Sequence, residues 1–188
     1  AGSILEGNTS VSASVASSDA AGNTTTANAT HAYSVDTSAS ATISIDAVTS
    51  DNVVNAAESV GTVTISGTVG GDARTGDAVT VQVGDHTVTT TVAEGGTWSV
   101  GVDGTVLADN VSVSASVAAS DAAGNTTTAS ATHAYSVDTS ASATISIDAV
   151  TSDNIVNAAE SDSTVTITGS VGGDAKTGDV VTVTVGEH

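Results

Sequence analysis

The fold is decided by the stretch TVTISGTVGGDARTGDAVTVQVGDHTVTTTVAEGGTWSVGV (62–102). Apolar residues alternate there with threonine, serine and glycine in four runs, 62–69, 78–84, 86–93 and 97–102. A period of two, rich in valine and threonine, is typical of strands that bury one face. The segments GGDARTGD and AEGG between runs are turn signals. The stretch therefore predicts four consecutive β-strands joined by turns.

The same alternation continues on both sides of this stretch. It predicts a first strand at 40–46, a sixth at 112–120 and a last at 126–137, with turn signals at DGTVLADN and DAAGN. Seven short strands in about 100 residues, with turns every 8–12, are typical of an immunoglobulin-like sandwich. The sequence thus predicts an all-β protein built of tandem immunoglobulin-like antiparallel β-sandwich domains.

A long internal repeat sets the domain organisation. Val11–Asn23 matches Val113–Asn125 at an offset of 102 residues, and 69 of the 86 comparable positions are identical. A period this long is a whole domain and not one rung of a solenoid. We therefore expect residues 1–36 to be the last strands of one repeat, 37–138 a complete repeat, and 139–188 the first strands of the next.

Composition limits the core and the class of protein. The chain has no Cys, Met, Phe or Pro and a single tryptophan, so valine, isoleucine and alanine must fill the core beside Trp98, Leu107 and Tyr135. Such a core gains less from hydrophobic burial than usual, and we expect each domain to need a further source of stability. The absence of cysteine excludes a disulfide framework. No run of about 18 apolar residues is present, so no membrane-inserting helix is expected.

Charge is the most extreme property of the sequence. The chain has 21 acidic and 2 basic residues, a formal net charge of -19. This charge argues against partners such as nucleic acid or an anionic membrane surface. Acidity by itself is explained by solubility or by adaptation to salt, whereas carboxylates placed together in loops would indicate cation ligands. The placement of the acids decides between these interpretations.

The acids lie in loops and are almost absent from the predicted strands. In an immunoglobulin-like topology, the first-to-second and fifth-to-sixth loops lie where the chain leaves the sandwich, and the second-to-third and sixth-to-seventh loops lie where it enters. The predicted exit group around Asp138 consists of Asp46, Asp51, Asn52, Asp109 and, from the next repeat, Asp174 and Asp179. The predicted entry group around Asp36 consists of Asp72, Asp77 and Asp121.

Calcium is the cation that these groups favour. Two carboxylates about 4 Å apart repel by roughly 4 kcal/mol at an effective dielectric constant near 20, and Ca²⁺ accepts six to eight oxygen ligands in flexible geometry. Softer metals prefer His or Cys, and the four histidines are isolated, with His31 and His133 expected to be strand residues. DAVTSDNVVNAAE does not fit an EF-hand, because Asp51 stands where glycine is required. For Asp19 and Asp121, the motif DAAGN is equally well explained as an ordinary turn.

Several motifs together resemble a known family. They are TISIDAVTSDNVVNAAES (42–59), GTVGGDARTGD (67–77), GGTWSVGVDGTVLAD (95–109), ASDAAGNTTTA (119–129) and SVDTSA (136–141). As a set they resemble the bacterial immunoglobulin-like repeats of giant repeats-in-toxin adhesins, of the biofilm and ice-binding types. The resemblance covers essentially the whole chain, and it implies a secreted, cell-surface protein whose repeats hold a distal ligand-binding region away from the cell.

The resemblance also implies Ca²⁺ at or near the linkers, where it would stiffen the array. Carried over to this chain, the joint residues are Asp36 and Asp138 in the two copies of SVDTSAS (34–40 and 136–142). The acidic loop gives Asp46, Asp51 and Asn52, with copies at Asp148, Asp153 and Asn154, and the GGD loop gives Asp72 and Asp77, with copies at Asp174 and Asp179. Related linkers often have proline after the Asp-Thr pair, but this chain has serine, so either the ion would contribute more of the stiffness or the joint is looser.

The predicted function is that of a structural extender whose partners are the neighbouring repeats of the same chain. The alternative is a repeat that itself binds carbohydrate, a host protein or ice, but aromatic residues that stack on sugars are nearly absent and Trp98 lies in a strand pattern. An enzyme is not expected, because no G-x-S-x-G motif is present and serine is too abundant to be informative. The ligand of the distal region is not predicted by these repeats.

Overall fold

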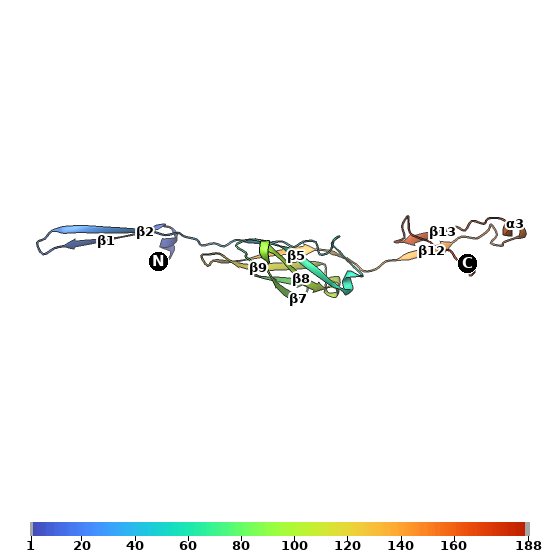
Figure 1. Ribbon diagram of the computed structural model, residues 1–188, viewed down its shortest axis with the longest axis horizontal. Coiled ribbons are helices and arrows are strands. Elements are labelled where there is room, and N and C mark those ends of the chain that lie inside the picture. The colour runs from blue at the N-terminus through green and yellow to red at the C-terminus, as the bar shows by residue number, and fades with distance from the viewer. Residues whose placement is uncertain (1, 187–188) are drawn as a thin grey trace.

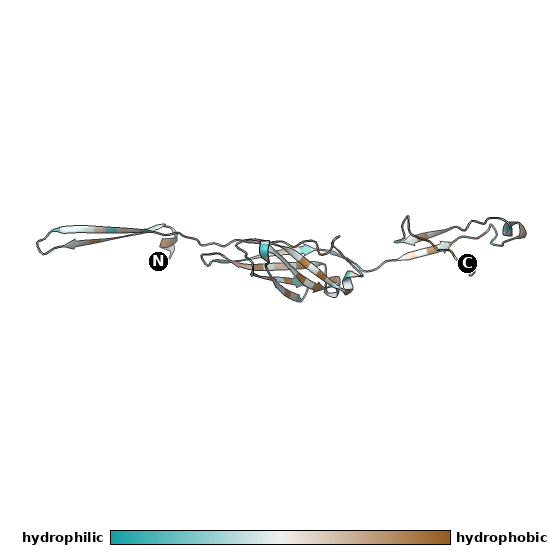
Figure 2. Cartoon of the chain, in the orientation of Figure 1, coloured by the Kyte–Doolittle hydropathy of each residue, from teal (hydrophilic) through white to brown (hydrophobic). Residues whose placement is uncertain are grey.

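The computed structural model describes residues 2–186 of an elongated chain (Figure 1). A long hairpin lies at one end, a β-sandwich in the middle and a smaller two-stranded segment at the other end. Hydrophobic and hydrophilic residues alternate along the strands of the sandwich (Figure 2). This alternation gives each sheet one buried face.

The central sandwich has two antiparallel sheets. The four-stranded sheet has the order β10-β9-β6-β7, formed by Thr126–Ala134, Ser112–Ser120, Ala78–Val83 and His86–Thr91. The three-stranded sheet has the order β3-β5-β8, formed by Ala41–Ile43, Thr62–Gly71 and Thr97–Asp103. All seven predicted strands are present, and the all-β immunoglobulin-like prediction is confirmed.

In addition to the two sheets, a pair of parallel strands closes the sandwich at its exit end. Strand β4 (Val53–Asn55) pairs with β11 (Ser136–Asp138), and Val54 lies opposite Val137. The chain makes this pair because it leaves the β3–β5 ladder after Asp46 and crosses to the last strand. The predicted first strand at 40–46 is therefore shorter, although Asp46 N still donates to the carbonyl of Ser66.

Short helices cover the exit end. The 3₁₀ helix η1 (Glu58–Val60) contacts helix α2 (Gly104–Ala108), where Gly104 N donates to the carbonyl of Gly61 at 2.7 Å. The DGTVLADN turn signal is thus part of a helical turn. Leu107 of α2 is fully buried, and its carbonyl accepts a hydrogen bond from the Tyr135 hydroxyl at 2.8 Å. A second 3₁₀ turn, η2 (Glu94–Gly96), precedes β8 at the entry end.

Aliphatic residues fill the core, as the composition predicts. No charged or polar residue is buried within residues 2–186, and Trp98 is the largest side chain in the core. The buried cluster consists of Val48, Val54, Ile65, Val79, Val81, Val83, Val92, Trp98, Val102, Leu107, Val113, Ala115, Val117 and Tyr135.

The flanking segments are partial copies of this sandwich. Helix α1 (Gly2–Glu6) and the hairpin β1–β2 (Ser10–Ser18 and Thr24–Ala32) repeat α2, β9 and β10. Strands β12 (Ala143–Ile147) and β13 (Gly169–Gly173) repeat the β3–β5 pair. Helix α3 (Ala158–Ser161) lies between these two strands in the sequence. No helix in residues 2–186 is long and apolar enough to cross a membrane.

Candidate metal sites at the joints between repeats

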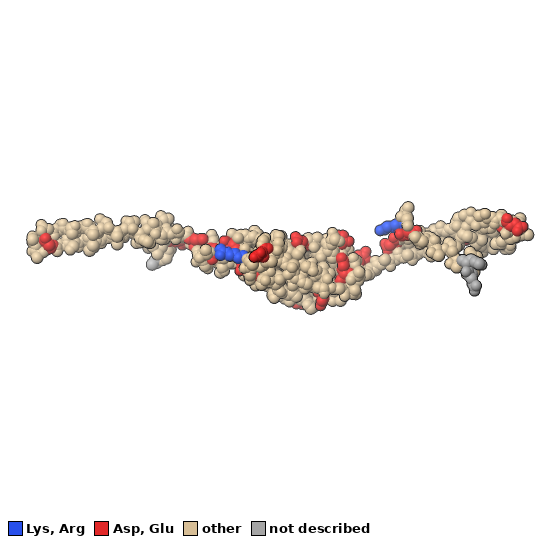
Figure 3. Space-filling model, viewed as in Figure 1, with Lys and Arg blue, Asp and Glu red and all other residues tan. Residues whose placement is uncertain are grey.

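Acidic side chains gather near the two ends of the central sandwich (Figure 3). The strands run from one end of the sandwich to the other, so the loops that connect them lie at its two ends. The β5–β6 and β9–β10 loops lie at the entry end, and the β4, α2 and β11 region lies at the exit end. The chain enters and leaves the sandwich at opposite ends (Figure 1).

At the entry joint, Asn125 connects two of the predicted ligands. Its side-chain Nδ2 lies 2.7 Å from Asp121 Oδ2, 3.2 Å from the carbonyl oxygen of Asp36 and 3.5 Å from Asp36 Oδ1. Three oxygens from positions far apart in the sequence therefore converge on one polar donor. The structure brings Asp36 and Asp121 to the same place, although by way of an asparagine that is not among the predicted ligands.

Hydrogen bonds hold Asp121 in its charged form. The side chain of Asn125 contributes most, with further bonds from the backbone of the same loop, and together they lower the pKa of Asp121. Asp19 and Asn23 repeat this arrangement in the β1–β2 loop, and the pKa of Asp19 is lowered for the same reason. The DAAGN motif is thus an ordinary turn that also presents a carboxylate oxygen to the joint.

The two acids of the GGD loop stabilise that loop. Asp72 Oδ2 accepts hydrogen bonds from the backbone N and hydroxyl of Ser40, at 2.8 and 3.1 Å, and Asp77 Oδ2 accepts one from Arg74 N at 2.8 Å. The first contact fixes the end of the linker to the loop. The contacts are repeated in the next copy by Asp174, which accepts from Ser142, and by Asp179, which accepts from Lys176 N.

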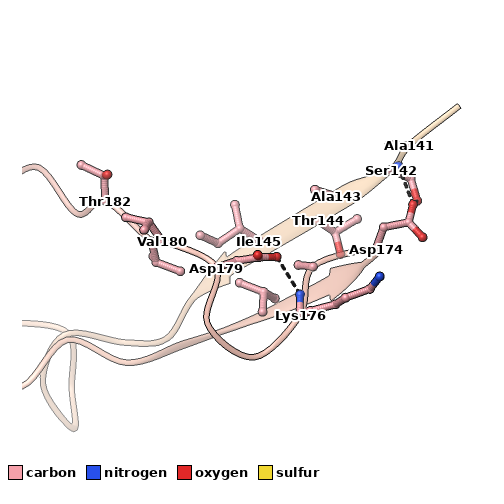
Figure 4. A pocket seen from close by; sticks show the side chains of 13 residues that line it. Ala141, Ser142, Ala143, Thr144, Ile145, Asp174, Lys176, Asp179, Val180 and Thr182 are labelled. Carbon is pink, nitrogen blue, oxygen red and sulfur yellow. Dashed lines mark hydrogen bonds between the residues drawn. The ribbon is translucent and has the colours of Figure 1, made fainter. Parts of the chain in front are cut away.

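In the second copy of the GGD loop, neighbouring hydrogen-bond donors and a nearby cation favour the charged form of Asp174 (Figure 4). Backbone and hydroxyl donors of Ser142, followed by the charge of Lys176, lower the pKa of Asp174. The only two basic residues of the chain, Arg74 and Lys176, occupy equivalent positions in this loop. Each copy of the GGD loop therefore combines a cation with two carboxylates.

At the exit joint, Asp138 closes a turn of the linker. Its Oδ1 accepts from Ser140 N at 3.2 Å, as Asp36 Oδ1 accepts from Ser38 N at 3.3 Å. Asp138 also lies opposite Asn55 in the β4–β11 pair. Asp109, another predicted ligand, follows α2 at the same end and lines a shallow hollow with Asp85 and His86.

Asp46 lies away from the predicted exit group. It stands opposite Ser66, in the middle of β5, and its Oδ2 accepts from the Ser66 hydroxyl at 2.8 Å. The copy behaves in the same way, because Thr168 donates to Asp148 at 2.8 Å. The prediction that Asp46 lies at the exit end was wrong, since the chain leaves the β3–β5 ladder halfway along the sheet.

Asn52 has a structural role that the sequence prediction missed. Its backbone is left-handed, with φ of 61°, and its Oδ1 accepts from Val48 N and from His133 Nε2, while its Nδ2 donates to the carbonyl of Ala134. Both ends of the amide are therefore engaged within the domain. The copy, Asn154, has the same backbone conformation and accepts from Val150 N.

The neighbouring aspartates form local turns. Asp51 Oδ1 accepts from the Thr49 hydroxyl and from Val53 N, and Asp153 makes the equivalent contacts. The backbone bond from the residue two positions on is the largest cause of the lowered pKa of both carboxyls. In both copies these contacts close a turn around the aspartate.

The predicted ligands do not form a single cluster. In residues 2–186, no three His, Cys, Asp or Glu side chains lie close enough together to hold a metal ion. The entry joint instead gathers two carboxylates with an amide and a backbone carbonyl. Asn125 and Ser40 are further residues at the entry joint that were not among the predicted ligands. The sequence signal for Asn125 was its place in the DAAGN motif with Asp121, which recurs in both copies. The calcium roles of the fourteen residues stay predictions.

Solved structures similar to this chain come from large bacterial adhesins. One, from work on how a 1.5-MDa bacterial ice-binding adhesin is retained on the host cell surface, is 44% identical with a TM-score of 0.78, covering 89% of this chain and 54% of that one. Another, a Ca²⁺-stabilized adhesin that helps an Antarctic bacterium reach out and bind ice, is 45% identical with a TM-score of 0.67, covering 92% and 43%. This chain spans about half the length of these structures or less. No protein-family model and no curated protein matches it.

The sandwich and its end-to-end joints define a tandem array of immunoglobulin-like domains. A bacterial immunoglobulin-like domain from the M. primoryensis ice-binding adhesin is 45% identical, with a TM-score of 0.50, and is covered over 100% of its length by 55% of this chain. The chain belongs to this family, the bacterial immunoglobulin-like domains of large adhesins.

Proposed function

We propose that this chain is a structural extender segment of a large adhesin, and that its repeats separate a distal ligand-binding region from the cell. The observation that carries the proposal is the position of the two joints at opposite ends of the sandwich (Figure 1). Each added repeat then lengthens the array instead of folding back on it. Its partners are the neighbouring repeats of the same chain, and no catalytic step is involved.

The relatives of this chain also support a proposal about the cellular location of the whole protein. The relatives are adhesins, one of them studied for its retention on the host cell surface. We propose that the whole protein is secreted and held at the outer surface of a bacterial cell by other parts of the chain. A net charge of -19 suits an extended array, because neighbouring repeats with the same charge repel and stay apart.

Calcium at the entry joint is the second part of the proposal. The carbonyl and Oδ1 of Asp36, with Asp121 Oδ2, already converge on one donor group, the amide of Asn125. Carboxylate, carbonyl and amide oxygens are the ligands that Ca²⁺ takes in proteins, and one relative is a Ca²⁺-stabilized adhesin. A bound ion would neutralise the paired acids and tie the linker to the β9–β10 loop.

The test compares the 188-residue chain in Ca²⁺, in Mg²⁺ and in chelator. Ca²⁺ should raise the thermal midpoint, followed through Trp98, and should stiffen the molecule in small-angle scattering, with no equal effect of Mg²⁺ at the same concentration. At a concentration 100 times Kd, one site adds about 2.7 kcal/mol to the free energy of unfolding. Identical melting and scattering in all three conditions would remove the calcium part of the proposal.

The spacer role is tested separately from the ion. An extender without its own ligand should stay in the liquid when ice grows slowly through the solution, and should give no hits on a glycan array. Adsorption to ice or glycan in either assay would instead favour a ligand-binding repeat.

A further inference from the structure

Strand β7 is an edge of the four-stranded sheet in the complete central domain, and one side of its backbone has no partner strand. It lies along the margin of the sandwich (Figure 1) and pairs with β6 alone. The turn between the two strands has two residues, Gly84 and Asp85, with φ of 55° at Gly84. A turn of this length makes Val83 and His86, which flank it, a pair that exchanges two hydrogen bonds.

Alternation from that pair decides which backbone groups point outward. In antiparallel strands every second residue bonds to the neighbouring strand, so the even-numbered residues of 86–90 bond to β6. The bond from Val92 N to the carbonyl of Asp77 continues this series. The N–H and C=O groups that point away from the sheet are those of Thr87, Thr89 and Thr91.

The opposite edge of the same sheet, β10, is closed at both ends. The carbonyl of Ala134 accepts a hydrogen bond from Asn52 Nδ2 at 2.9 Å, and at the other end Asn125 meets Asp36 of the linker. Strand β7 has neither lysine nor proline nor an acid, which are residues that often protect exposed edges. The β7 edge is therefore open to a further strand.

A second copy of the same edge is a strand that matches it. When two β7 strands pair antiparallel about a two-fold axis at Thr89, Thr87 of one copy lies opposite Thr91 of the other. The outward N–H and C=O groups of all three threonines then have partners. Their exposed side chains form cross-strand Thr–Thr pairs, which stabilise antiparallel sheets. The edge is therefore self-complementary.

Charge also favours this edge as the place where two copies meet. The chain has 21 acidic and 2 basic residues, so two copies repel one another over most of their surface. Strands β6 and β7 contain no acidic residue, whereas the other edge on this side, β8, ends at Asp103. In the two-fold register Asp85 of one copy lies opposite Ala93 of the other, next to Glu94. This repulsion weakens the contact in low salt and is screened in high salt.

We propose that the β7 edge pairs antiparallel with the β7 edge of a second copy of this chain, so that two four-stranded sheets become one continuous sheet. Strand β7 runs from the exit end, where its turn borders α2, to η2 at the entry end. The second chain therefore runs in the opposite direction. The cellular consequence rests on the extender role proposed above: arrays that run in opposite directions project from two facing cells, and the contact joins those cells.

Each contact is small, and an array of repeats multiplies it. One six-residue strand from each copy gives a contact well below the roughly 1,200 Å² that stable interfaces bury, so two single domains bind weakly. Arrays with the same 102-residue period present such edges at the same spacing. After the first contact, the others form at high effective concentration. The strength of the adhesion therefore depends on the number of repeats.

The absence of cysteine from the chain allows a direct cross-linking test. Opposite residues in a hydrogen-bonded antiparallel pair have Cα atoms about 5.5 Å apart, a separation that a disulfide spans. The full 188-residue chain is oxidised mildly at high concentration, in chelator and high salt. Thr89→Cys should form disulfide dimers at least about tenfold faster than Thr64→Cys, because facing thiols have a high effective concentration. Thr64 is the matched control, since it is also exposed, on the outer face of β5.

A mixture of two variants tests the direction of pairing. Thr87→Cys and Thr91→Cys should each cross-link slowly alone and quickly when mixed, because these positions face each other only in the antiparallel register. Thr89→Cys reacting no faster than Thr64→Cys, or Thr87→Cys reacting as fast alone as in the mixture, would overturn the proposal. The assay contains no ice, glycan or Ca²⁺, so such a result leaves the extender role untouched.

Discussion

At the residue scale, one asparagine holds the strand crossover in place. Asn52 has a left-handed backbone, which Asn adopts more readily than most residues, and its side chain joins the 47–52 loop to Ala134 and His133 of β10. The crossover that produces the parallel β4–β11 pair therefore depends on this residue. The same residue type recurs at Asn154 with φ of 59°.

Two replacements of Asn52 should separate the contributions of its backbone conformation and of its side chain to the free energy of unfolding. Asn52→Ala loses the side-chain hydrogen bonds and places in the left-handed region a residue that tolerates it less well than asparagine, so we expect a loss of about 2–4 kcal/mol in urea unfolding. Asn52→Gly loses only the hydrogen bonds and should cost about half as much. Equal losses in the two variants would show that the backbone conformation contributes nothing.

Asp121 should give the entry end a pH dependence. Its pKa is lowered by Asn125, so the charged carboxylate contributes stability above the unfolded pKa of about 3.9 and loses it as pH falls through the lower folded pKa. In chelator, the difference in thermal midpoint between the parent and Asp121→Asn should therefore shrink as pH falls from about 6 to about 3.

The comparison must be a difference between two proteins. Lowering the pH also removes repulsion among the 21 acidic residues, and this general effect opposes the local one. It is nearly the same in parent and variant and cancels. A difference that stays constant or grows toward low pH would contradict the role assigned to Asp121.

At the element scale, the alternation of apolar and polar residues predicted the longer strands. Strand β4 and helix α2 instead depend on contacts between segments that are far apart in the sequence. The strands at 62–71, 78–83 and 97–103 follow local patterns that each segment carries by itself. Strand β4 has three residues and exists because β11 pairs with it, so no local pattern could show it. Helix α2 is too short for a helical period and is held by Gly104 against Gly61.

The candidate site was harder to predict for the same reason. That Asp36 and Asp121 meet follows from the order of loops in an immunoglobulin-like sandwich. That Asn125 lies between them depends on a contact across 89 positions of sequence. Asp46 was misplaced because the break in its strand is set by the crossover at Asn52, which lies outside that strand's own pattern.

Close packing between β3, β5 and β8 should make Gly67 intolerant of a side chain. A Cβ there would overlap the carbonyl of Ser44 and lie 2.8 Å from Trp98 Cζ2. Gly67→Ala must displace backbone and should cost about 3 kcal/mol or more, with a change in Trp98 fluorescence.

Gly101→Ala is the matched control in the same sheet. Its Cβ would lie 2.9 Å from Thr62 Cγ2, the end of an exposed side chain that can rotate away. We expect a change below about 1 kcal/mol, because alanine also reduces the freedom of the unfolded chain. Equal losses for the two variants would show that the approach at Gly67 is not tight.

At the scale of the whole molecule, the joints should bend independently of domain stability. Asp138 accepts a hydrogen bond within the linker and is not part of the buried core. Asp138→Ala should broaden the distribution of molecular lengths in scattering. The melting of the central domain, followed through Trp98, should shift by no more than about 4 °C.

Asp36→Ala is the companion variant at the other joint, where Asp36 also meets Asn125. In Ca²⁺ it should loosen the entry joint, because Asp36 is the residue through which the linker contacts Asn125 of the β9–β10 loop. Unfolding of the central domain by Asp138→Ala would instead show that this residue belongs to the domain core.

The parallel pairing of β4 and β11 has a mechanical consequence. When the two ends of the sandwich are pulled apart, tension acts along the strands, and β11 must slide past β4 while β3 slides past β5. All the bonds of each ladder are then loaded in shear at once, instead of breaking one after another as in peeling. A rod made of such units would resist drag on the cell as a tether, with each domain breaking only when a whole ladder fails.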